Sequence, residues 1–429
     1  MPLMRALLMP RMQRLPLTLV SLVVLLALPS WFLLRFPRRV ATGLERLLPA
    51  AALLQSFPAQ PNQQPPSLWQ QRLGTGLADR LWPQQRRFWW QLWGAHADAG
   101  AYLAFSAPQS LPLPANALRI DDLIVVAPDP LARQLLQEQL KARLPVPRGL
   151  IQRCSQSLRQ QQSVHWSAGA LGQMLGALAP LANDVQQGCF VLSSQGTSLV
   201  WQGEADVVDG SLGAQPPLLP VPASMPLPRS QWLELRGANL DLLLAGVLTS
   251  SVLRESLAQT YGLGPETLRR FRTMPFQLRL APVARGPFAA RLELQLSVGP
   301  HAELAQRWLG DLSEALRDQG LTPAQPMRGL TAWQRDGGSL VGGWRWLPGR
   351  RDLLLFLGPL PAAVPSSPPL GDVAWRLRLR SADMAKASLF PSSLPQLMQR
   401  ADQVQLIGRP LGARSGERRS ALAGRLELH

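Results

Sequence analysis

One uncharged hydrophobic run, at residues 15–34, constrains this chain more than any other feature of its sequence. A helix of about 20 apolar residues spans the hydrocarbon core of a bilayer. Basic residues lie on both sides of the run, at Arg5, Arg11, Arg14, Arg35, Arg38 and Arg39. The run therefore predicts a single N-terminal transmembrane helix, with the rest of the protein tethered to one side of a membrane.

A cleaved signal peptide also opens with a basic start and an apolar core, but that core is usually about 7–15 residues long. This run is longer, no small-x-small cleavage site follows it, and Arg38 and Arg39 lie where a cleavage region is normally uncharged. We expect a stub at residues 1–14 and an uncleaved signal anchor at 15–35. Because long domains translocate largely regardless of charge, we expect the body to be exported, to a periplasmic or thylakoid-lumenal side.

Arginine gives the chain a formal net charge of +17, since Lys141 and Lys386 are its only lysines. Such a balance suits anionic lipid, an acidic protein or nucleic acid. The arginines are dispersed, which is more typical of solvated faces than of a basic binding block. With a membrane tether, we expect a membrane-protein or acidic protein partner, with anionic lipid as a further candidate and nucleic acid last.

Shifts in composition divide the exported body into segments. Residues 36–66 read as a juxtamembrane segment and a proline-rich linker, and residues 67–99 as a Trp- and Arg-rich amphipathic segment. Beyond them, strands and helices predict one α+β unit at 100–229, a second at 230–366 and a partial third at 367–429. A stretch with six prolines, at 215–228, reads as a joint between domains.

Periodicity predicts the elements of these units. Apolar alternation predicts strands at 102–105, 123–126, 189–192, 198–201, 232–236, 276–280, 291–296, 330–333, 340–346, 353–357 and 373–380. Helical spacing predicts helices at 131–144, 168–181, 240–248 and 301–319. Asp129 with Pro130 is a start signal for the first of these helices, and Gly320 is a stop signal for the last.

Two pairs of segments recur at nearly equal offsets along the chain. Residues 233–240 resemble 377–384, and residues 196–200 resemble 337–341. A repeated offset indicates a duplicated supersecondary unit. We therefore predict an α+β fold in which the anchor is followed by duplicated antiparallel sheet-plus-helix units.

At these residues the chain resembles an uncharacterised bacterial family of membrane-anchored exported proteins, which carries a domain of unknown function and is common in cyanobacteria. The shared pattern is a strand pair, a helix and a pair of Trp-bearing strands, here at 264–280, 286–320 and 329–358. The resemblance implies an exported α+β body without an activity, because the family has no catalytic motif. The Trp-rich stretch before Gly100 departs from it.

Tryptophan and arginine alternate in the amphipathic segment at 67–99. One interpretation is an interfacial belt, with rings at head-group depth and guanidinium groups on phosphates. The other is that the rings pack into the core of the body. In the first interpretation the residues that contact the membrane surface are Trp69, Trp82, Arg86, Arg87, Trp89, Trp90 and Trp93.

A basic row is predicted on the strand at 373–380. Arg376, Arg378 and Arg380 share one face of it, spaced by about 6.6–6.8 Å. The row could meet lipid or nucleic-acid phosphates, but we favour the solvated outer face of an antiparallel sheet. The two cysteines, Cys154 and Cys189, would form a disulfide in an exported protein or remain buried thiols.

No set of residues in the sequence identifies a reaction. The four histidines lack metal-ligand spacing, and there is no Cys-x-x-Cys, nucleophile elbow or phosphate loop. We therefore expect no catalytic residue, metal or cofactor, and a non-enzymatic body that binds or scaffolds a membrane-protein complex or the membrane surface. The alternatives are a carrier for an apolar ligand or lipid, held between sheet and helices, and a hydrolase with scattered catalytic residues.

Overall fold

The computed structural model describes residues 41–94, 100–141, 148–168, 170, 185–206, 218–247, 251–284, 290–324, 329–335, 337–349, 351–361, 369–389, 396–411 and 419–428. The predicted anchor at 15–35 and nearly all of the predicted helix at 168–181 lie outside these residues. None of the helices in the described ranges is long and apolar enough to cross a bilayer.

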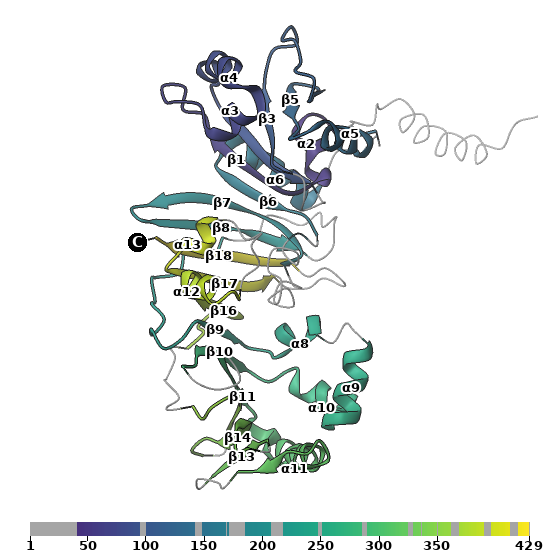
Figure 1. The fold of residues 1–429 in the computed structure, drawn as a ribbon, viewed down its shortest axis with the longest axis vertical. Helices are drawn as coiled ribbons and strands as arrows, with labels where there is room; N and C mark the ends of the chain where they lie inside the picture. The colour runs from purple at the N-terminus through teal and green to yellow at the C-terminus, as the bar shows by residue number, and fades with distance from the viewer. Residues whose placement is uncertain are drawn as a thin grey trace, which may run out of the picture.

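One large antiparallel sheet dominates an elongated α/β molecule (Figure 1). Neighbouring strands pair across the described residues in the order β4 (Ala117–Ile120), β5 (Leu123–Val126), β3 (Tyr102–Ser106), β2 (Phe88–Gly94), β1 (Ala51–Pro58), β6 (Ser163–Trp166), β7 (Gln187–Gln195), β8 (Ser198–Asp206), β18 (Arg419–Glu427), β17 (Gln403–Leu411), β16 (Trp375–Leu379), β9 (Leu233–Gly237), β10 (Phe276–Pro282), β11 (Ala290–Ser297), β15 (Asp352–Leu357), β14 (Leu340–Trp346), β13 (Leu330–Gln334) and β12 (Thr322–Pro323).

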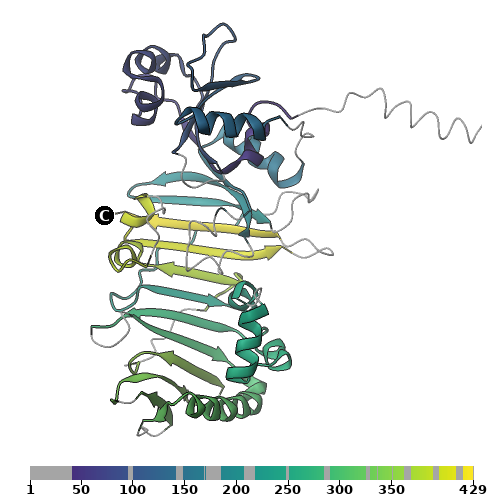
Figure 2. The same ribbon diagram turned by 45° about the vertical axis from the view of Figure 1, so that its right-hand side comes forward.

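Helices lie at both ends of this sheet and beside its middle strands (Figure 2). Those nearest the start of the fold are α2 (Leu44–Leu47), α3 (Ser67–Leu73), α4 (Thr75–Leu81), α5 (Pro130–Gln139) and α6 (Gly149–Gln160), with 3-10 turns η1 (Leu48–Ala50) and η2 (Trp82–Gln84). The others are α8 (Asp241–Val247), α9 (Ser251–Tyr261), α10 (Pro265–Phe271), α11 (Ala302–Asp318), α12 (Ser381–Lys386) and α13 (Gln396–Arg400), with the turn η4 (Gly299–His301).

Local sequence signals place several of these elements. Asp129 Oδ1 accepts a hydrogen bond from the Ala132 amide at 2.8 Å and caps α5, which begins with Pro130. Gly320 follows α11 with a φ of 79°, which a glycine adopts without strain. Gly196, with a φ of 61°, turns the predicted hairpin that is β7 and β8. Capping and turn chemistry therefore act here as the sequence predicts.

The sheet passes through the predicted segment boundaries. β1 lies within the predicted juxtamembrane segment and linker, yet it pairs with β2 on one side and β6 on the other. Residues 51–58 of the predicted juxtamembrane segment and linker are therefore a strand inside the sheet. β2, from the predicted amphipathic segment, pairs with β3, and β16, from the predicted third unit, pairs with β9. Backbone pairing joins segments that composition separates.

Tryptophans of the amphipathic segment form a core, which corrects the interfacial interpretation. Trp69, Trp82 and Trp89 are at most 5% exposed. Trp69 stands edge-on to the other two indoles, at centroid distances of 5.1 and 6.2 Å, and lies 4.7 Å from the Phe105 ring. Large rings that meet in this way gain packing energy beyond their buried area. These indoles therefore face one another and β3, not a membrane surface.

The remaining members of the predicted belt do not share one surface. Trp90 is 5% exposed in a neighbouring core, and its indole N–H donates to the Leu158 carbonyl at 2.9 Å. Trp93 is half-buried, whereas Arg86 and Arg87 are exposed. Because Trp89, Trp90 and Trp93 all lie on β2, strand alternation sends them to different sides of the sheet.

The described part of the proline-rich stretch, from residue 218, is a strap that crosses the sheet. Leu219 packs against Ile407 of β17 and against β18. Further along, the Leu227 amide donates to Gln403 Oε1 at 3.2 Å. Prolines suit this path because an extended strap of this kind needs few backbone donors. Residues 218–228 therefore cover strands from β18 to β16, where the sequence predicts a joint between domains.

Candidate functional site

The central strands separate two kinds of side chain onto two faces. On β10, Leu278 and Leu280 point to one side, and Gln277 and Arg279 point to the other. Residues that pair directly across an antiparallel ladder share a face, so the registers of β9, β11 and β16 extend both sets sideways. We call them the leucine face and the charged face.

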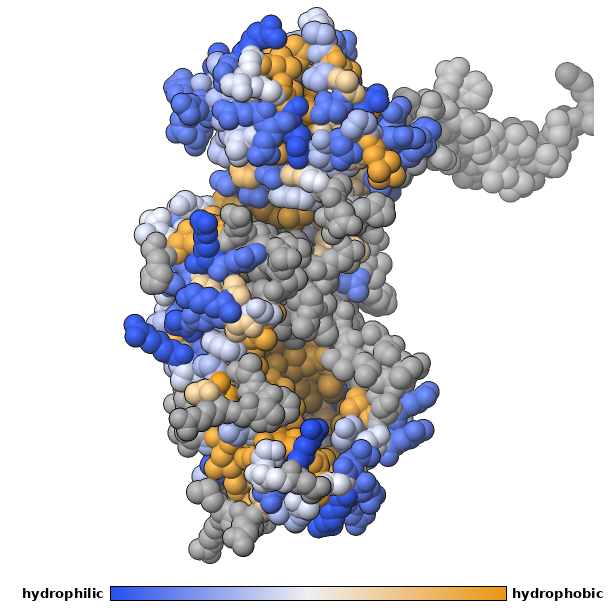
Figure 3. Space-filling view, in the orientation of Figure 1, coloured by the Kyte–Doolittle hydropathy of each residue, from blue (hydrophilic) through white to orange (hydrophobic). Residues whose placement is uncertain are grey.

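The leucine face is only half covered. Its half-buried members are Leu192, Leu199, Leu278, Leu280, Leu292, Leu294, Leu355, Leu377 and Leu406. Leu357, on the same face of β15, is 55% exposed. Figure 3 shows an apolar hollow between the strands β9–β11 and the helices α8 and α10. The face is therefore the floor of a groove with apolar walls.

Helices close one end of this groove. Phe271 of α10 and Trp308 of α11 are buried, with their rings 5.2 Å apart and nearly perpendicular. They pack in one cluster with Phe276 and Leu296, at the end of β10 and β11 that leads into the helices. The predicted apolar helix is α8, and its described leucines, such as Leu242, are half-buried against the same cluster.

Two tryptophan rings on the leucine face lie flat across the neighbouring strand. A Cβ atom at Gly408 would lie 2.3 Å from the Trp375 ring, and one at Gly424 would lie 2.3 Å from the Trp201 ring. In each case the glycine is the direct cross-strand partner of the tryptophan. The indoles can therefore lie across the strands only because these positions lack a side chain.

The charged face is closed. Glu234 accepts from Arg378 Nη2 at 2.8 Å and from Gln277 Nε2 at 3.0 Å, and all three residues are at most 7% exposed. Beside them, Arg279 lies 3.5 Å from Glu293, at 2% and 4% exposure. Burial lowers the pKa of Arg279, while the two carboxylates act to raise it. Charges on this face are neutralised by one another across the strands rather than by water.

The predicted basic row of Arg376, Arg378 and Arg380 is corrected by this closure. Arg378 is buried, and it also donates to the Met225 carbonyl of the strap at 3.4 Å. Arg380 directly precedes α12, and its Nε lies 2.6 Å from Asp383 Oδ2. The strap covers the strand, so its outer face is not the solvated one that alternation predicts.

Arg376, the third member of the row, stands directly opposite Arg236 on β9. Its Nη2 donates to the carbonyls of Pro369 and Leu370, at 3.3 and 3.5 Å. Burial lowers the pKa of Arg376, and the neighbouring Arg378 and Arg236 lower it further. These contacts hold the guanidinium against its own chain, away from a flat phosphate surface.

The two cysteines are bonded to each other. Cys154 of α6 and Cys189 of β7 form a disulfide with Cα atoms 5.7 Å apart. Beside it lies a cavity of about 230 Å³, where Arg153 and Glu204 form a two-bond ion pair at 2.5 and 2.8 Å. Cys189 and Glu204 are cross-strand partners on the charged face. The disulfide therefore attaches α6 to that face.

His165 lies beside this disulfide as the cross-strand partner of Cys189. It is 1% exposed, and neither ring nitrogen has a hydrogen-bond partner among the described residues. Desolvation lowers its pKa to about 4. Within the described ranges, no group of three or more His, Cys, Asp or Glu side chains is arranged to hold a metal ion.

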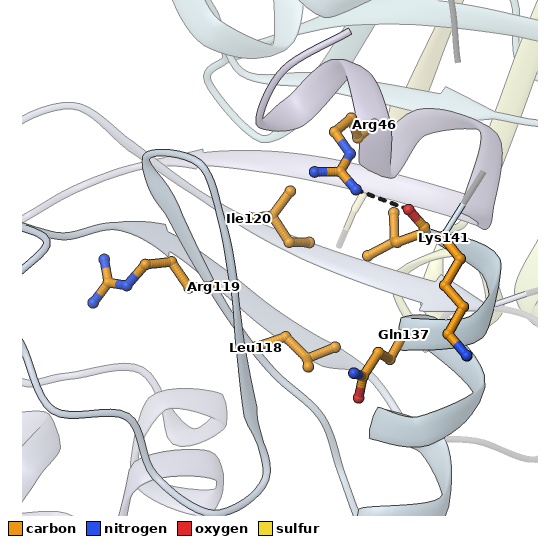
Figure 4. Close-up of a pocket in the computed structure, with 7 residues that line it drawn as sticks. Arg46, Leu118, Arg119, Ile120, Gln137 and Lys141 are labelled. Carbon is orange, nitrogen blue, oxygen red and sulfur yellow. Dashed lines mark hydrogen bonds between the residues drawn. The ribbon is translucent and has the colours of Figure 1, made fainter. Parts of the chain in front are cut away.

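A second cavity, of about 430 Å³, lies at the edge strand β4, near the start of the fold. Figure 4 shows Arg46 and Lys141 beside Leu118 and Ile120, with Gln137 at the rim. Three cationic side chains line the cavity together with leucine and isoleucine. Sequence reasoning misses this site because its residues come from α2, β4 and the end of α5, which share no motif.

Comparison with known proteins adds little to this geometry. No protein-family model and no curated protein matches the chain. A solved structure that is similar in part is crystal form IV of TP0453, with a TM-score of 0.26 and 12% sequence identity. The similarity covers 44% of this chain and 75% of that one. The resemblance to a cyanobacterial family stays a prediction.

Proposed function

We propose that this chain is a non-enzymatic, membrane-anchored binding protein whose exported body holds an acyl chain of a lipid on its leucine face. The observation that carries the proposal is the contrast in cover along β10, since Leu278 and Leu280 are half-buried while Arg279 between them is 2% exposed. The side chains on the charged face of β10 are buried. The exposure of these leucines therefore does not reflect loose packing of the whole sheet. Contiguous exposed apolar surface on a protein indicates an interaction site.

An acyl chain fits the chemistry of this groove. It needs no hydrogen-bond partner along its length, and strand alternation keeps charged side chains off the groove floor. Each methylene group that leaves water contributes about 0.8 kcal/mol. Because Phe271 and Trp308 close one end, the tail would lie toward the helices, and the polar head would lie toward the exposed Leu357.

The predicted anchor at 15–35 supports a lipid ligand, because it would keep the groove beside a source of lipid. A membrane-protein partner that covers the same leucines with its own apolar segment is the other outcome of the test below. In both cases the exported location and the absence of a reaction remain part of the proposal.

We also propose that the sheet is built from two copies of one unit, at residues 51–206 and 233–427. The sheet order β5-β3-β2-β1-β6-β7-β8 corresponds to β15-β11-β10-β9-β16-β17-β18, and the last strands of the two copies pair with each other. Trp166 lies against Gly188 in β6 and β7, as Trp375 lies against Gly408 in β16 and β17. These boundaries replace the predicted units at 100–229, 230–366 and 367–429. Such a duplication would produce the long leucine face.

Photocrosslinking tests the ligand directly. The full chain, reconstituted in liposomes, would be supplied with a diazirine-bearing fatty acid, irradiated and digested. We expect labelled peptides from β10 and β11, and at least tenfold less label there in the double variant Leu278→Gln, Leu294→Gln. The control is Leu218→Gln, a leucine of the strap that is 54% exposed and lies away from the groove.

Labelling confined to residues 15–35 and equal in all variants would overturn the lipid proposal, because it would report only the bilayer. Co-purification of a protein whose crosslinks map to Leu278 and Leu294 would replace the acyl chain with a protein partner. The two results are distinguished by the mass added to the labelled peptides.

A further inference from the structure

We infer that the end of the body formed by α2, α5 and β4 rests on the bilayer surface, with Leu131 and Leu135 among the acyl chains and Arg46 and Lys141 at anionic head groups. The inference rests on the proposed anchor and adds the docking surface and its lipid partner. It gives the membrane contact to α5 in place of the tryptophans, which the structure buries.

Chain length brings this end of the body close to the membrane. The hydrophobic run ends at Leu34, and Ala41, only 2% exposed, is already part of the fold. Seven extended residues span at most about 25 Å. If the run crosses the bilayer, the start of the fold therefore lies within about 25 Å of the hydrocarbon edge.

Packing places α5 at the same end. Arg46 of α2 donates from Nη2 to the Leu140 carbonyl, just beyond the last residue of α5, at 2.8 Å. Leu44 and Leu136 share one core cluster. Figures 1 and 2 both show α2 and α5 together where the chain enters the fold. Leu131 lies nine residues before Leu140, which is about 14 Å along a helix.

The outer side of α5 carries two exposed leucines among glutamine and glutamate side chains. Leu131 is 66% exposed and Leu135 is 41% exposed, and residues four apart lie one above the other on a helix. Figure 3 shows an apolar patch over α5, beside the point where the chain leaves the described residues. Leucines of this kind, flanked by basic residues, are typical of a helix that lies in a membrane interface.

The edge cavity places cations at the same end of the fold as α5. The Arg46 and Lys141 side chains are 32% and 64% exposed. Lys141 pairs with Glu138 at 2.6 Å, but an ammonium group has three donors, so two remain for phosphate oxygens. Arg119 donates to the carbonyls of Pro108 and Leu111, which ties the rim of the cavity to the loop before β4. Arg46 Nη1 also lies 3.9 Å from Asp121 Oδ2, so the rim presents three cations, two of them paired with a carboxylate, at the end of the body that carries α5.

Depth measurement on the full chain tests the docking. Both cysteines of the chain are in the disulfide, so a single added cysteine carries a unique label. Leu131→Cys would be labelled with a nitrobenzoxadiazole fluorophore and reconstituted in liposomes that contain nitroxide-labelled lipid. We expect its fluorescence to fall by more than half, and that of Leu397→Cys, at a leucine 43% exposed on α13, to stay unchanged.

The basic rim has a matched control, because the chain has one other lysine. Lys141 and Lys386 are both exposed and both lie three residues from a carboxylate partner. In vesicles that contain phosphatidylglycerol, Lys141→Gln should shift the docking equilibrium by about fivefold toward the undocked state, and Lys386→Gln should not. In vesicles of phosphatidylcholine alone, neither substitution should change the docking equilibrium.

Equal quenching at positions 131 and 397 would overturn the docking surface, provided that the chain resists carbonate extraction. Release of the chain by carbonate would instead overturn the anchor on which the proposed function depends. If the label at 131 is quenched but Lys141→Gln has no effect in anionic vesicles, the head-group contact is overturned and only the apolar contact stands.

Discussion

The leucine face and the charged face of the central sheet reverse the usual relation between polarity and burial. Along β10, Gln277 and Arg279 are at most 7% exposed, and Leu278 and Leu280 between and beside them are half-buried. An antiparallel sheet normally covers its apolar face and leaves its polar face in water. Here the strap covers the charged face of β16, whereas the helices cover the leucine face only in part, so that Leu235 is 2% exposed and its partner Leu278 is half-buried.

The exposure of the leucines and the burial of the charges both reduce the stability of the fold. Burying charges removes them from water, and only close pairs such as Glu234 with Arg378 make that tolerable. Leaving leucines half exposed forgoes about 25 cal/mol per Å² of uncovered apolar surface. A ligand or partner on the leucine face would recover this energy, so the comparison between the faces can be tested by mutation.

The largest effect on stability should come from removing a buried ion pair on the charged face. Glu234→Gln leaves the buried Arg378 guanidinium without its carboxylate, and removal of one partner from a buried pair costs about 3–5 kcal/mol. We expect urea unfolding of the full chain to show a loss of this size. The control is Glu266→Gln on α10, whose exposed pairs with Arg269 and Arg270 should contribute no more than about 1 kcal/mol. Equal losses would contradict the closed charged face.

The disulfide should have the next largest effect, because it holds α6 over the charged face. Closing a loop across a sequence separation of 35 stabilises a fold by about 2–4 kcal/mol. We expect reductant to lower the free energy of unfolding by this amount. In the double variant Cys154→Ala, Cys189→Ala, the loss should be present already, and added reductant should change nothing further. If reductant still destabilised that variant, the disulfide would not be the cause of the loss.

Acid should weaken the same region through His165. Its folded pKa of about 4 lies below the unfolded value of about 6.5, so the unfolded chain binds the extra proton in this window. His165 therefore contributes stability above pH 6.5 that is lost as pH falls toward 4. Between pH 7.5 and pH 5 we expect a loss of about 2 kcal/mol. His165→Phe should remove this part of the pH dependence, and an unchanged profile would contradict a neutral buried ring.

The smallest effect should come from the leucine face. Because the Leu280 side chain is only half-buried, Leu280→Gln removes little buried apolar surface. We expect it to lower the free energy of unfolding by about 1 kcal/mol or less. Arg279→Gln, one residue away on the same strand, should cost more, since it removes the buried cation beside Glu293 and leaves that carboxylate with Arg291 alone, at 2.7 Å. Comparing the two urea midpoints tests the reversal within one strand. A larger loss for Leu280→Gln would mean that the leucine face is a closed core.

Local features of this fold are predictable from sequence, and long-range ones are not. Asp129 and Pro130 predict the start of α5, because an N-cap side chain satisfies backbone donors within one turn of the helix. The alternation of β10 and β11 predicts both faces, because side chains in a strand point alternately up and down. No local signal connects β8 with β18, which pair over more than 200 residues of sequence. The edge cavity is hidden for the same reason.

The sequence by itself determined the strands β3, β5, β7 to β11 and β13 to β16, the caps, the separation of leucines from charges and the prediction of a membrane anchor. It did not predict β1, β2, β4, β6, β12, β17 or β18. Only the tertiary structure decided which face is sealed, that the tryptophans near Trp89 form a core, and that Cys154 meets Cys189. The physical reason is that propensity and alternation act over a few residues. Cover depends instead on which distant segment, such as the proline strap or α6, packs over a given face.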